Sequence, residues 1–151
     1  MATAATSAEP ALSELYERDE TAWLEAMSAL AAAGRSAELD LTNLAEYLAD
    51  LAKRDKREVF SRLVVLLAHL LKYDYQPDRR TGSWRGTIRE QRRELRQLFA
   101  SATLRRHAQS VLDDACAAAR RQAADETELA LETFPLTNPW TLDDALGFAD
   151  E

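Results

Sequence analysis

The stretch that decides the fold runs from residue 56 to residue 75 and reads KREVFSRLVVLLAHLLKYDY. Its apolar side chains recur every three or four residues and cover most of the circumference of a helix, which is typical of a helix in the middle of a bundle. Pro77 cannot continue a helix, and Thr81-Gly82-Ser83 is typical of a loop. The stretch therefore predicts a central helix that ends close to Tyr75.

Two more helices are predicted before this stretch. Apolar residues at helical spacing predict a helix from about residue 12 to Ala33, and Gly34 is a suitable residue to end it. Asp40 is a good N-cap for a second helix, which covers residues 41–52. The predicted buried face of this second helix consists of Leu41, Leu44, Ala45, Leu48, Leu51 and Ala52.

The connection between the second helix and the central helix has two interpretations. The apolar face of residues 41–52 lies about a quarter-turn from that of residues 60–71 at 100° per residue. Asp55 followed by Glu58 also resembles a capping box, which would satisfy the amides of a new helix start. We therefore expect a break near Asp55. The alternative is one continuous helix with a kink, because no glycine or proline separates the two stretches.

After the loop, the pattern predicts two long helices and a short one. The first covers residues 84–99 with Ser83 as its cap, and the second covers residues 104–125 with small inward-facing side chains that permit close packing. Thr141 is expected to cap a short last helix together with Asp144, three residues further on.

The segment before the last helix, residues 132–140, should be extended. Pro135 and Pro139 disfavour a helix before them, and Phe134 and Trp140 are expected to pack this segment against the helices. The complete prediction is all-α: a compact bundle of about five helices, a short C-terminal helix and an extended Pro-containing tail. We expect a flexible tail at residues 1–11 and a single helical domain at residues 12–151.

Composition supports this fold class and suggests a compartment. The chain has 151 residues with only four glycines and four prolines, and the strong helix formers alanine, leucine, glutamate and arginine dominate. A single cysteine, Cys116, fits a reducing environment. The N-terminus does not resemble a secretory signal, and the longest apolar run is far shorter than the roughly 20 residues that span a bilayer. We therefore expect a cytoplasmic protein without a membrane segment.

Charge is distributed unevenly along the chain, although the formal net charge is −7. Ten acidic residues lie between Glu9 and Asp50, where Arg18 and Arg35 are the only basic residues. Nine arginines lie between residues 79 and 106, together with only two acidic residues. Residues 125–151 contain eight acidic residues and no basic one. The middle of the chain is thus a basic region between two acidic flanks.

The sequence contains few candidates for chemistry. Neither His69 nor His107 follows a glutamate at the spacing of a di-iron bundle, and the chain offers too few histidines and cysteines for a zinc site. A phosphate-binding loop and a nucleophile elbow are also missing from the sequence. We therefore expect no enzyme, no metal and no cofactor. An enzymatic alternative would pair His69 with Asp19 or Glu90 as acid and base.

Cys116 and His69 are expected to have structural roles. Cys116 has anionic neighbours that disfavour a thiolate, so a small, partly buried core residue is the simplest interpretation. His69 is expected to be a hydrogen-bonded residue at the edge of its helix, although it could also bind an anion with its cationic neighbours Arg62 and Lys72.

The most informative feature is a stripe of arginines on the helix at residues 84–99. The four arginines repeat at four-three-four spacing beside the apolar seam, and none has a carboxylate three or four residues away, whereas Arg93 has Glu90. Such a row must be neutralised by tertiary contacts, by a ligand or by water. The stripe consists of Arg85, Arg89, Arg92 and Arg96.

Asp19 could supply one partner for this stripe. By helical angle it falls on the apolar face of the first helix, where an unpaired carboxylate is expensive to bury. We therefore hypothesise that the first helix packs against the arginine helix and that Asp19 pairs with Arg85 or Arg89. Replacing Asp19 with alanine would then cost about 3–5 kcal/mol.

Three interpretations of the arginine stripe remain open. Pairing with the acidic flanks of the chain is the simplest. An acidic protein partner is a second. Nucleic acid is the third, because Arg79, Arg80 and Trp84 adjoin the stripe, although the negative net charge opposes binding of a polyanion.

Several segments together resemble a bacterial family called domain of unknown function 29. They are Leu15-Tyr-Glu-Arg-Asp19 followed by Trp23, Leu39–Glu46, His69–Pro77, Ser83–Leu95 and Glu132-Thr-Phe-Pro135. The resemblance covers about residues 12 to 146, and it implies a compact all-helical fold without an agreed activity. The recurring polar positions of the family correspond here to Asp19, His69, Gln76, Arg80, Trp84, Arg85, Arg89, Glu90 and Arg93.

Two positions depart from the family pattern. Cys116 stands where a larger, often aromatic residue is usual, and Asn138 stands where cysteine is frequent. Both departures argue against a redox role for this chain.

The sequence as a whole favours a non-enzymatic interaction or regulatory module. We expect a protein partner, with nucleic-acid binding as the disfavoured alternative. The candidate interaction residues are Asp19, His69, Arg80, Trp84, Arg85, Arg89, Arg92, Arg93 and Arg96.

Overall fold

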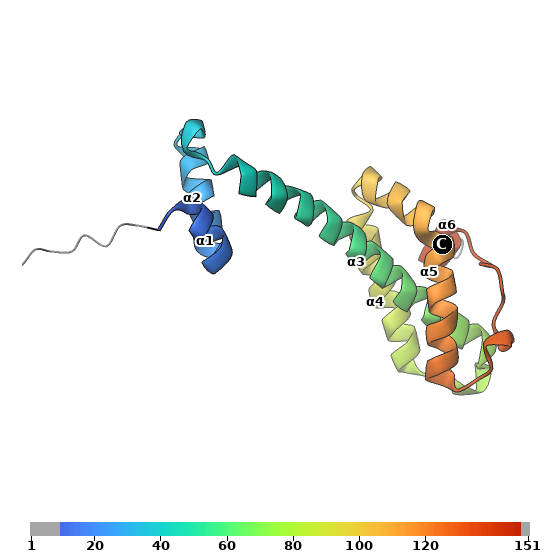
Figure 1. The fold of residues 1–151 in the computed structure, drawn as a ribbon. Helices are drawn as coiled ribbons and strands as arrows, with labels where there is room; N and C mark the ends of the chain where they lie inside the picture. The colour runs from blue at the N-terminus through green and yellow to red at the C-terminus, as the bar shows by residue number, and fades with distance from the viewer. Residues whose placement is uncertain (1–9, 149–151) are drawn as a thin grey trace, which may run out of the picture. The chain divides into compact units, whose positions relative to one another are not determined.

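The computed structural model describes residues 10–148, which form six α-helices, three short 3₁₀ helices and no strand (Figure 1). The all-α fold class is therefore confirmed. Within this fold the chain divides into two compact units, residues 1–52 and residues 53–151. Most of the predicted N-terminal tail, residues 1–9, lies outside the described residues.

The first predicted helix is in fact two helices, α1 (Leu12–Arg18) and α2 (Glu20–Ala32). Asp19 separates them, because its backbone is not helical (φ −151°, ψ 83°) and its carboxylate accepts a hydrogen bond from the amide of Ala22 at 3.1 Å. A capping aspartate satisfies one of the amides that a first helical turn leaves without a partner. The prediction of one unbroken helix is therefore wrong.

Trp23 is the centre of the N-terminal unit, residues 1–52. Its fully buried ring contacts Tyr16 of α1 and Tyr47 of α3 (Leu41–Tyr75), with ring centroids 4.8 Å and 5.7 Å apart. The indole N–H donates a hydrogen bond to the carboxylate of Asp40 at 3.1 Å. The side chain of Asn43 donates to the same carboxylate at 2.7 Å, and these bonds lower the pKa of Asp40, that from Asn43 most. Asp40 lies directly before α3, in the predicted N-cap position.

α3 is one continuous helix of 35 residues. The break expected near Asp55 is therefore wrong, and the alternative of a continuous helix is correct. Glu58 does not close a capping box, because its carboxylate accepts a hydrogen bond from Arg62, one turn further on, at 2.9 Å.

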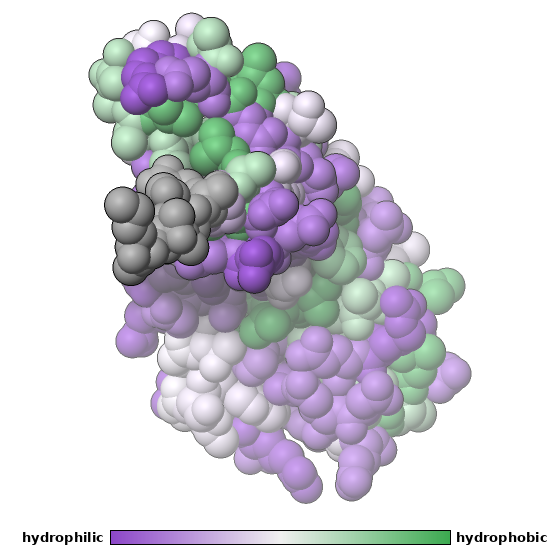
Figure 2. Space-filling view, turned by 60° about the vertical axis from the view of Figure 1, so that its left-hand side comes forward, coloured by the Kyte–Doolittle hydropathy of each residue, from purple (hydrophilic) through white to green (hydrophobic). Residues whose placement is uncertain are grey.

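The first half of α3 is mostly exposed to solvent. None of the residues 41–58 is buried, and Leu41 and Leu48, which were predicted to face inward, are 64% and 55% exposed. Leu44 and Leu51 are half-buried. Figure 2 shows one face of the molecule, on which hydrophilic residues predominate and smaller hydrophobic areas interrupt them. The predicted apolar face of residues 41–52 is therefore only partly covered.

The remaining helices belong to the C-terminal unit, residues 53–151, and they closely match the sequence prediction. α3 ends at Tyr75 as expected, and it is followed by η2 (Pro77–Arg79) and by α4 (Gly82–Leu98). Thr81, not Ser83, caps α4, because its hydroxyl accepts the amide of Trp84 at 3.3 Å. Ser101 caps α5 (Ala102–Thr127) in the same way.

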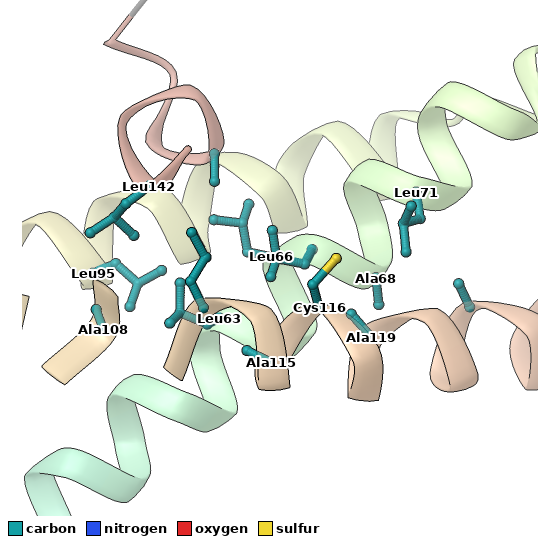
Figure 3. Close-up of a cluster of buried hydrophobic side chains, with 14 of the residues drawn as sticks. Leu63, Leu66, Ala68, Leu71, Leu95, Ala108, Ala115, Cys116, Ala119 and Leu142 are labelled. Carbon is teal, nitrogen blue, oxygen red and sulfur yellow. The ribbon is translucent and has the colours of Figure 1, made fainter. Parts of the chain in front are cut away.

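The core of the C-terminal unit lies where α3, α4, α5 and the last helix meet (Figure 3). Leucines of α3 and α4 pack against a row of alanines on α5, whose small side chains permit close approach. Cys116 belongs to this row and is only 5% exposed, as expected for a small core residue. Burial raises the pKa of its thiol, and nearby Asp113 adds to this.

The tail returns along the C-terminal unit as predicted. After η3 (Leu131–Thr133), Phe134 is buried and its ring meets the edge of Tyr75 at 5.6 Å between centroids. Trp140 is half-buried against the core. The short last helix, α6 (Leu142–Leu146), begins with the predicted capping box of Thr141 and Asp144, in which each side chain accepts the other's amide at 3.1 Å.

Candidate functional site

The arginine stripe borders a cleft of about 620 Å³ in the C-terminal unit. α3 forms one wall, α4 contributes the stripe, and Trp140 with α6 and the residue after it forms the other wall. The four-three-four spacing keeps the arginines on one face of α4, so that all four reach the same cleft. The cleft is lined by Leu70, Tyr73, Asp74, Arg85, Ile88, Arg89, Arg92, Arg96, Trp140, Asp144 and Gly147.

Two of the four arginines hold the end of α6. Arg92 donates from Nε to the carbonyl oxygen of Ala145 at 2.9 Å, and Arg96 donates from Nη2 to that of Leu146 at 2.7 Å. The last carbonyls of a helix have no partner within the helix and carry its negative dipole end, so a guanidinium is well suited to this position. Arg92 and Arg96 are therefore partnered within the C-terminal unit.

Further contacts fix α6 in the same place. Gly147 has a left-handed φ of +79°, and a Cβ atom there would lie 2.9 Å from Nη1 of Arg92. The guanidinium of Arg96 lies over the ring of Phe148, 4.9 Å from its centroid. Arg105 of α5 forms an ion pair with Asp143 of α6 at 2.6 Å. The C-terminal helix is thus held by its buried side chains Leu142, Ala145 and Leu146 and, at its end and outer side, by arginines of α4 and α5.

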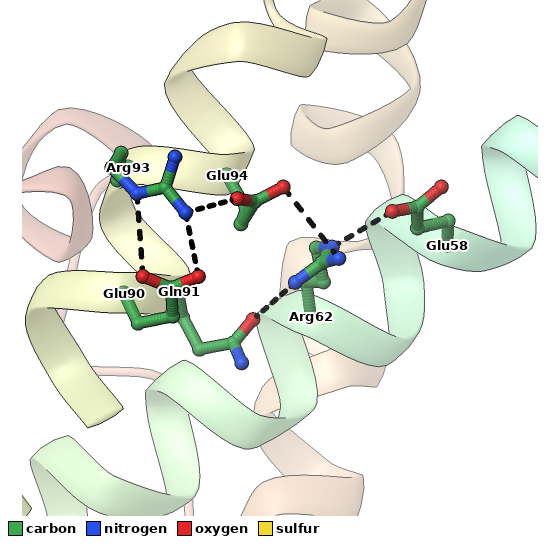
Figure 4. A network of polar contacts seen from close by, with 6 residues as sticks. All are labelled: Glu58, Arg62, Glu90, Gln91, Arg93 and Glu94. Carbon is green, nitrogen blue, oxygen red and sulfur yellow. Dashed lines mark hydrogen bonds and ion pairs between the residues drawn. The ribbon is translucent and has the colours of Figure 1, made fainter.

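Arg93 points into a separate polar network (Figure 4). It pairs with Glu90 at 2.7 Å, as its spacing predicts, and also with Glu94 at 2.5 Å. Arg62 of α3 continues the network, because it lies 3.7 Å from Glu94 and donates to Gln91 at 3.2 Å. The hydrogen bond from Arg93, more than any other contact, lowers the pKa of Glu90. Arg62 therefore joins α3 to α4, whereas Arg93 pairs only with glutamates of its own helix and does not line the cleft.

Arg85 and Arg89 differ from the other arginines of the helix. Both side chains are exposed at the cleft, one helical turn apart. Neither forms a hydrogen bond, an ion pair or a ring contact with any residue from 10 to 148. The carboxylates that line the cleft are those of Asp74 and Asp144, and Asp144 already accepts the amide of Thr141. These two guanidinium groups remain available to a ligand.

Arg80 and Trp84 contact side chains near the end of α3. Arg80 donates to the carbonyl oxygen of Tyr73 at 2.7 Å, and its guanidinium lies 4.3 Å from the centroid of the Tyr73 ring. The half-buried ring of Trp84 lies under Nζ of Lys72 at 5.2 Å. Both residues therefore fix the position of α3 side chains beside the loop, and neither lines the cleft itself.

His69 lies in a different environment from the cleft. Its ring nitrogen Nδ1 is 2.8 Å from the carbonyl oxygen of Val65, and burial is the main reason why its pKa is lowered. Its ionisable neighbours are Lys72 and Glu126, which form an ion pair at 2.6 Å. Burial acts to raise the pKa of Glu126, but hydrogen bonds from Lys72 and Gln122 outweigh it, and the pKa is lowered. His69 therefore has the hydrogen-bonded position that the sequence suggested.

Asp19 does not have the predicted environment. Its side chain is exposed and caps α2, so the premise of a buried carboxylate in need of a donor is wrong. The sequence prediction placed Asp19 on the apolar face because it counted 100° per residue through a single helix. Asp19 is not helical, so this angle does not apply to it. The physical argument for a pair between Asp19 and Arg85 or Arg89 therefore no longer holds.

We also searched the described residues for metal-binding groups and for membrane-spanning helices. Within residues 10–148 no group of three or more histidine, cysteine, aspartate or glutamate side chains could hold a metal ion. In the same part of the chain, no helix combines the length and the apolar character that crossing a bilayer requires.

Comparison with known proteins places the chain in a family. The model of the family described as domain of unknown function DUF29 matches residues 15–149, nearly the whole chain. The chain belongs to this family. No curated protein and no solved structure matches it significantly. Membership confirms the resemblance found in the sequence, and it assigns no activity to this DUF29 domain.

Several important contacts of this DUF29 domain could not be found by sequence reasoning. The partners of Arg92 and Arg96 are backbone carbonyls about 50 residues away, and a carbonyl has no signature in a sequence. Lys72 pairs with Glu126 across 54 residues. Gly147 gave a weak sequence signal for the end of α6, because a glycine directly after a short predicted helix often takes a left-handed conformation.

Proposed function

We propose that this DUF29 domain is a non-enzymatic interaction module that binds a carboxylate-rich segment of a partner protein in the arginine-lined cleft. One observation carries the proposal: Arg85 and Arg89 stand one turn apart at a concave surface, without partners among residues 10–148. Each guanidinium can donate two parallel hydrogen bonds to a carboxylate. The half-buried Trp140 and Tyr73 beside them offer apolar contact for the side chains between two acidic residues.

The charges around the cleft favour a protein segment over nucleic acid. Arg92 and Arg96 already have partners, so the stripe leaves two guanidinium groups for phosphates, whereas binding to nucleic acid draws much of its affinity from many phosphate contacts, about 6–10 in strongly salt-dependent cases. Asp74 and Asp144 would also repel a continuous row of phosphates. A peptide can place carboxylates at the arginines and neutral side chains opposite the aspartates.

The enzymatic alternative lacks an assembled acid–base pair. His69 contacts the backbone of Val65, while Glu90 is bound to Arg93 in the network on the other side of α4. Asp19 caps a helix of the N-terminal unit. We therefore propose binding, and no reaction, for this domain.

The test compares capture by the full-length chain and by two double variants, each immobilised and exposed to a lysate of the native host. Arg85→Glu/Arg89→Glu reverses the free charges of the cleft. Arg18→Glu/Arg121→Glu is the matched control, because both residues are exposed and form no hydrogen bond or ion pair with residues 10–148. Circular dichroism checks that all three proteins are equally helical.

We expect mass spectrometry to identify a protein with an acidic segment that the wild type and the control capture and that the cleft variant loses. Identical capture by all three proteins would contradict the proposal. Retention of the wild type on heparin that disappears in the cleft variant would favour nucleic acid instead, with an affinity that falls steeply with salt.

A further inference from the structure

A second set of free cations lies on α3, away from the cleft. Lys53, Arg54, Lys56 and Arg57 are all exposed, and none forms a hydrogen bond or an ion pair with a residue in the range 10–148. Lys56 and Arg57 have no carboxylate three or four residues away in the helix, whereas Lys53 and Arg54 lie one turn after Asp50. Residues 53–57 therefore form a denser group of free charges than the arginine stripe.

Two of these cations border a groove between α3 and α5. The groove has a volume of about 420 Å³ and shares no lining residue with the cleft. Phe60 and Val111 form its floor and are half-buried. The complete lining is Lys56, Arg57, Phe60, Ser61, His107 and Val111. It contains no acidic residue, so its edge is cationic and its floor is apolar.

An edge and a floor of this kind match an anionic, amphipathic ligand. Water can solvate the two cations, but it gains little from the apolar floor, which remains a favourable place to bury a hydrophobic side chain. An amphipathic helix presents apolar residues every three or four positions with charged residues beside them, and such helices are recognised in grooves between helices. Carboxylates beside the apolar row would then reach Lys56 and Arg57.

The distribution of acids argues for a protein helix and against nucleic acid. Asp114 is exposed and lies on the same face of α5 as His107 and Val111, three residues beyond the floor. A phosphate backbone following the groove would meet this carboxylate, whereas a peptide can present a neutral or basic residue there. We propose that the groove between α3 and α5 is a second docking site, which binds an acidic amphipathic helix of a protein partner.

The test uses a synthetic acidic amphipathic peptide as its probe. The peptide has leucines at three- and four-residue spacing and glutamates on the flank near the leucines, and it carries a fluorescent label. A peptide of the same composition in scrambled order has no apolar face and serves as the probe control. Binding to the full-length chain is measured by fluorescence anisotropy, and a labelled single-stranded DNA is measured in parallel.

Three double variants locate the binding. Lys56→Glu/Arg57→Glu changes the groove edge, and Lys53→Glu/Arg54→Glu makes the same charge change on the same helix outside the groove lining. Arg85→Glu/Arg89→Glu changes only the cleft. We expect the groove variant to bind the amphipathic peptide at least about tenfold more weakly, which corresponds to roughly 1.4 kcal/mol. The other two variants should keep the affinity within about threefold.

The outcomes separate this site from the cleft. Loss of binding in the groove variant alone supports the proposal, whatever the cleft variant does in lysate capture. No saturable binding of the amphipathic peptide would overturn it. The proposal would also be overturned if the scrambled peptide bound equally well, or if both α3 variants weakened binding equally. Either result would show that the peptide is attracted by the overall charge of the helix and not by the groove. Tighter binding of the DNA than of the peptide would assign the surface to nucleic acid.

Discussion

At the scale of single residues, the arginines of α4 show that position in the fold decides the role of a side chain. Arg85 and Arg89 are free at the cleft, Arg92 and Arg96 bind carbonyl oxygens of α6, and Arg93 binds glutamates. All five are chemically identical. Their roles differ because α6 covers only the C-terminal half of the stripe.

Gly147 should be intolerant of a side chain. Gly147→Ala places a Cβ 2.9 Å from the guanidinium of Arg92 and holds alanine at φ +79°, a conformation that costs about 1–3 kcal/mol. We expect a loss of that size in the free energy of unfolding, measured with urea. Gly86→Ala is the control, because a Cβ there meets nothing within 4 Å and alanine favours the helix by about 0.5–1 kcal/mol. Equal effects of both substitutions would contradict the close contact.

Asp40 should make the environment of Trp23 sensitive to acid. Hydrogen bonds from Asn43 and Trp23 lower the pKa of Asp40 in the folded state. A group with a depressed folded pKa stabilises the fold above its unfolded pKa, which is about 3.9 for aspartate, and this contribution is lost as the pH falls through the lower, folded value. We expect the indole N–H resonance of Trp23 to shift in that acid range. In Asp40→Asn this acid shift should disappear, and its persistence would assign the titration to another group.

At the scale of elements, short helices here depend on their ends. α6 has only five residues, too few to be stable by propensity alone. It persists because Leu142, Ala145 and Leu146 are buried in the core, the capping box closes its first turn, and Arg92 and Arg96 satisfy its last carbonyls. α2 likewise begins where Asp19 supplies a cap.

The capping role of Asp19 can be measured directly. Asp19→Ala should cost about 0.5–2 kcal/mol of stability, the usual value for loss of an N-cap. Asp19→Ser should restore most of it, because a serine hydroxyl can accept the same amide hydrogen bond from Ala22. A loss of about 3–5 kcal/mol that serine does not rescue would instead indicate a buried charge pair. Chemical denaturation of the three proteins distinguishes these cases.

At the scale of the whole molecule, charge and core are divided between the two units. Residues 1–52 contain ten acidic and two basic residues, while residues 53–151 contain sixteen acidic and seventeen basic residues. The negative net charge thus belongs to the N-terminal unit. Among residues 10–52 only Trp23 and Met27 are buried, whereas the core of the C-terminal unit has nineteen buried members.

This imbalance predicts unequal local stability. Regions with few buried apolar contacts open with a low free energy, so their amides exchange with solvent faster. We expect hydrogen-exchange mass spectrometry to show weak protection from residue 12 to residue 52 and strong protection of Leu63–Leu71 and of residues 108–124. Equal protection of both units would mean that the chain unfolds as one cooperative body.

Sequence patterns alone established the helical class, the ends of α3, α4 and α5 to within about two residues, the capping box of α6 and the family of the chain. These features depend on local periodicity and on caps, which neighbouring residues determine. The break at Asp19 is also local, because its carboxylate caps α2, but the apolar periodicity on both sides concealed it. The continuity of α3 and the division of the arginine stripe depended on tertiary structure. The partners of Arg92 and Arg96 lie about 50 residues away, and no local pattern reveals which backbone carbonyls a folded chain brings to a guanidinium.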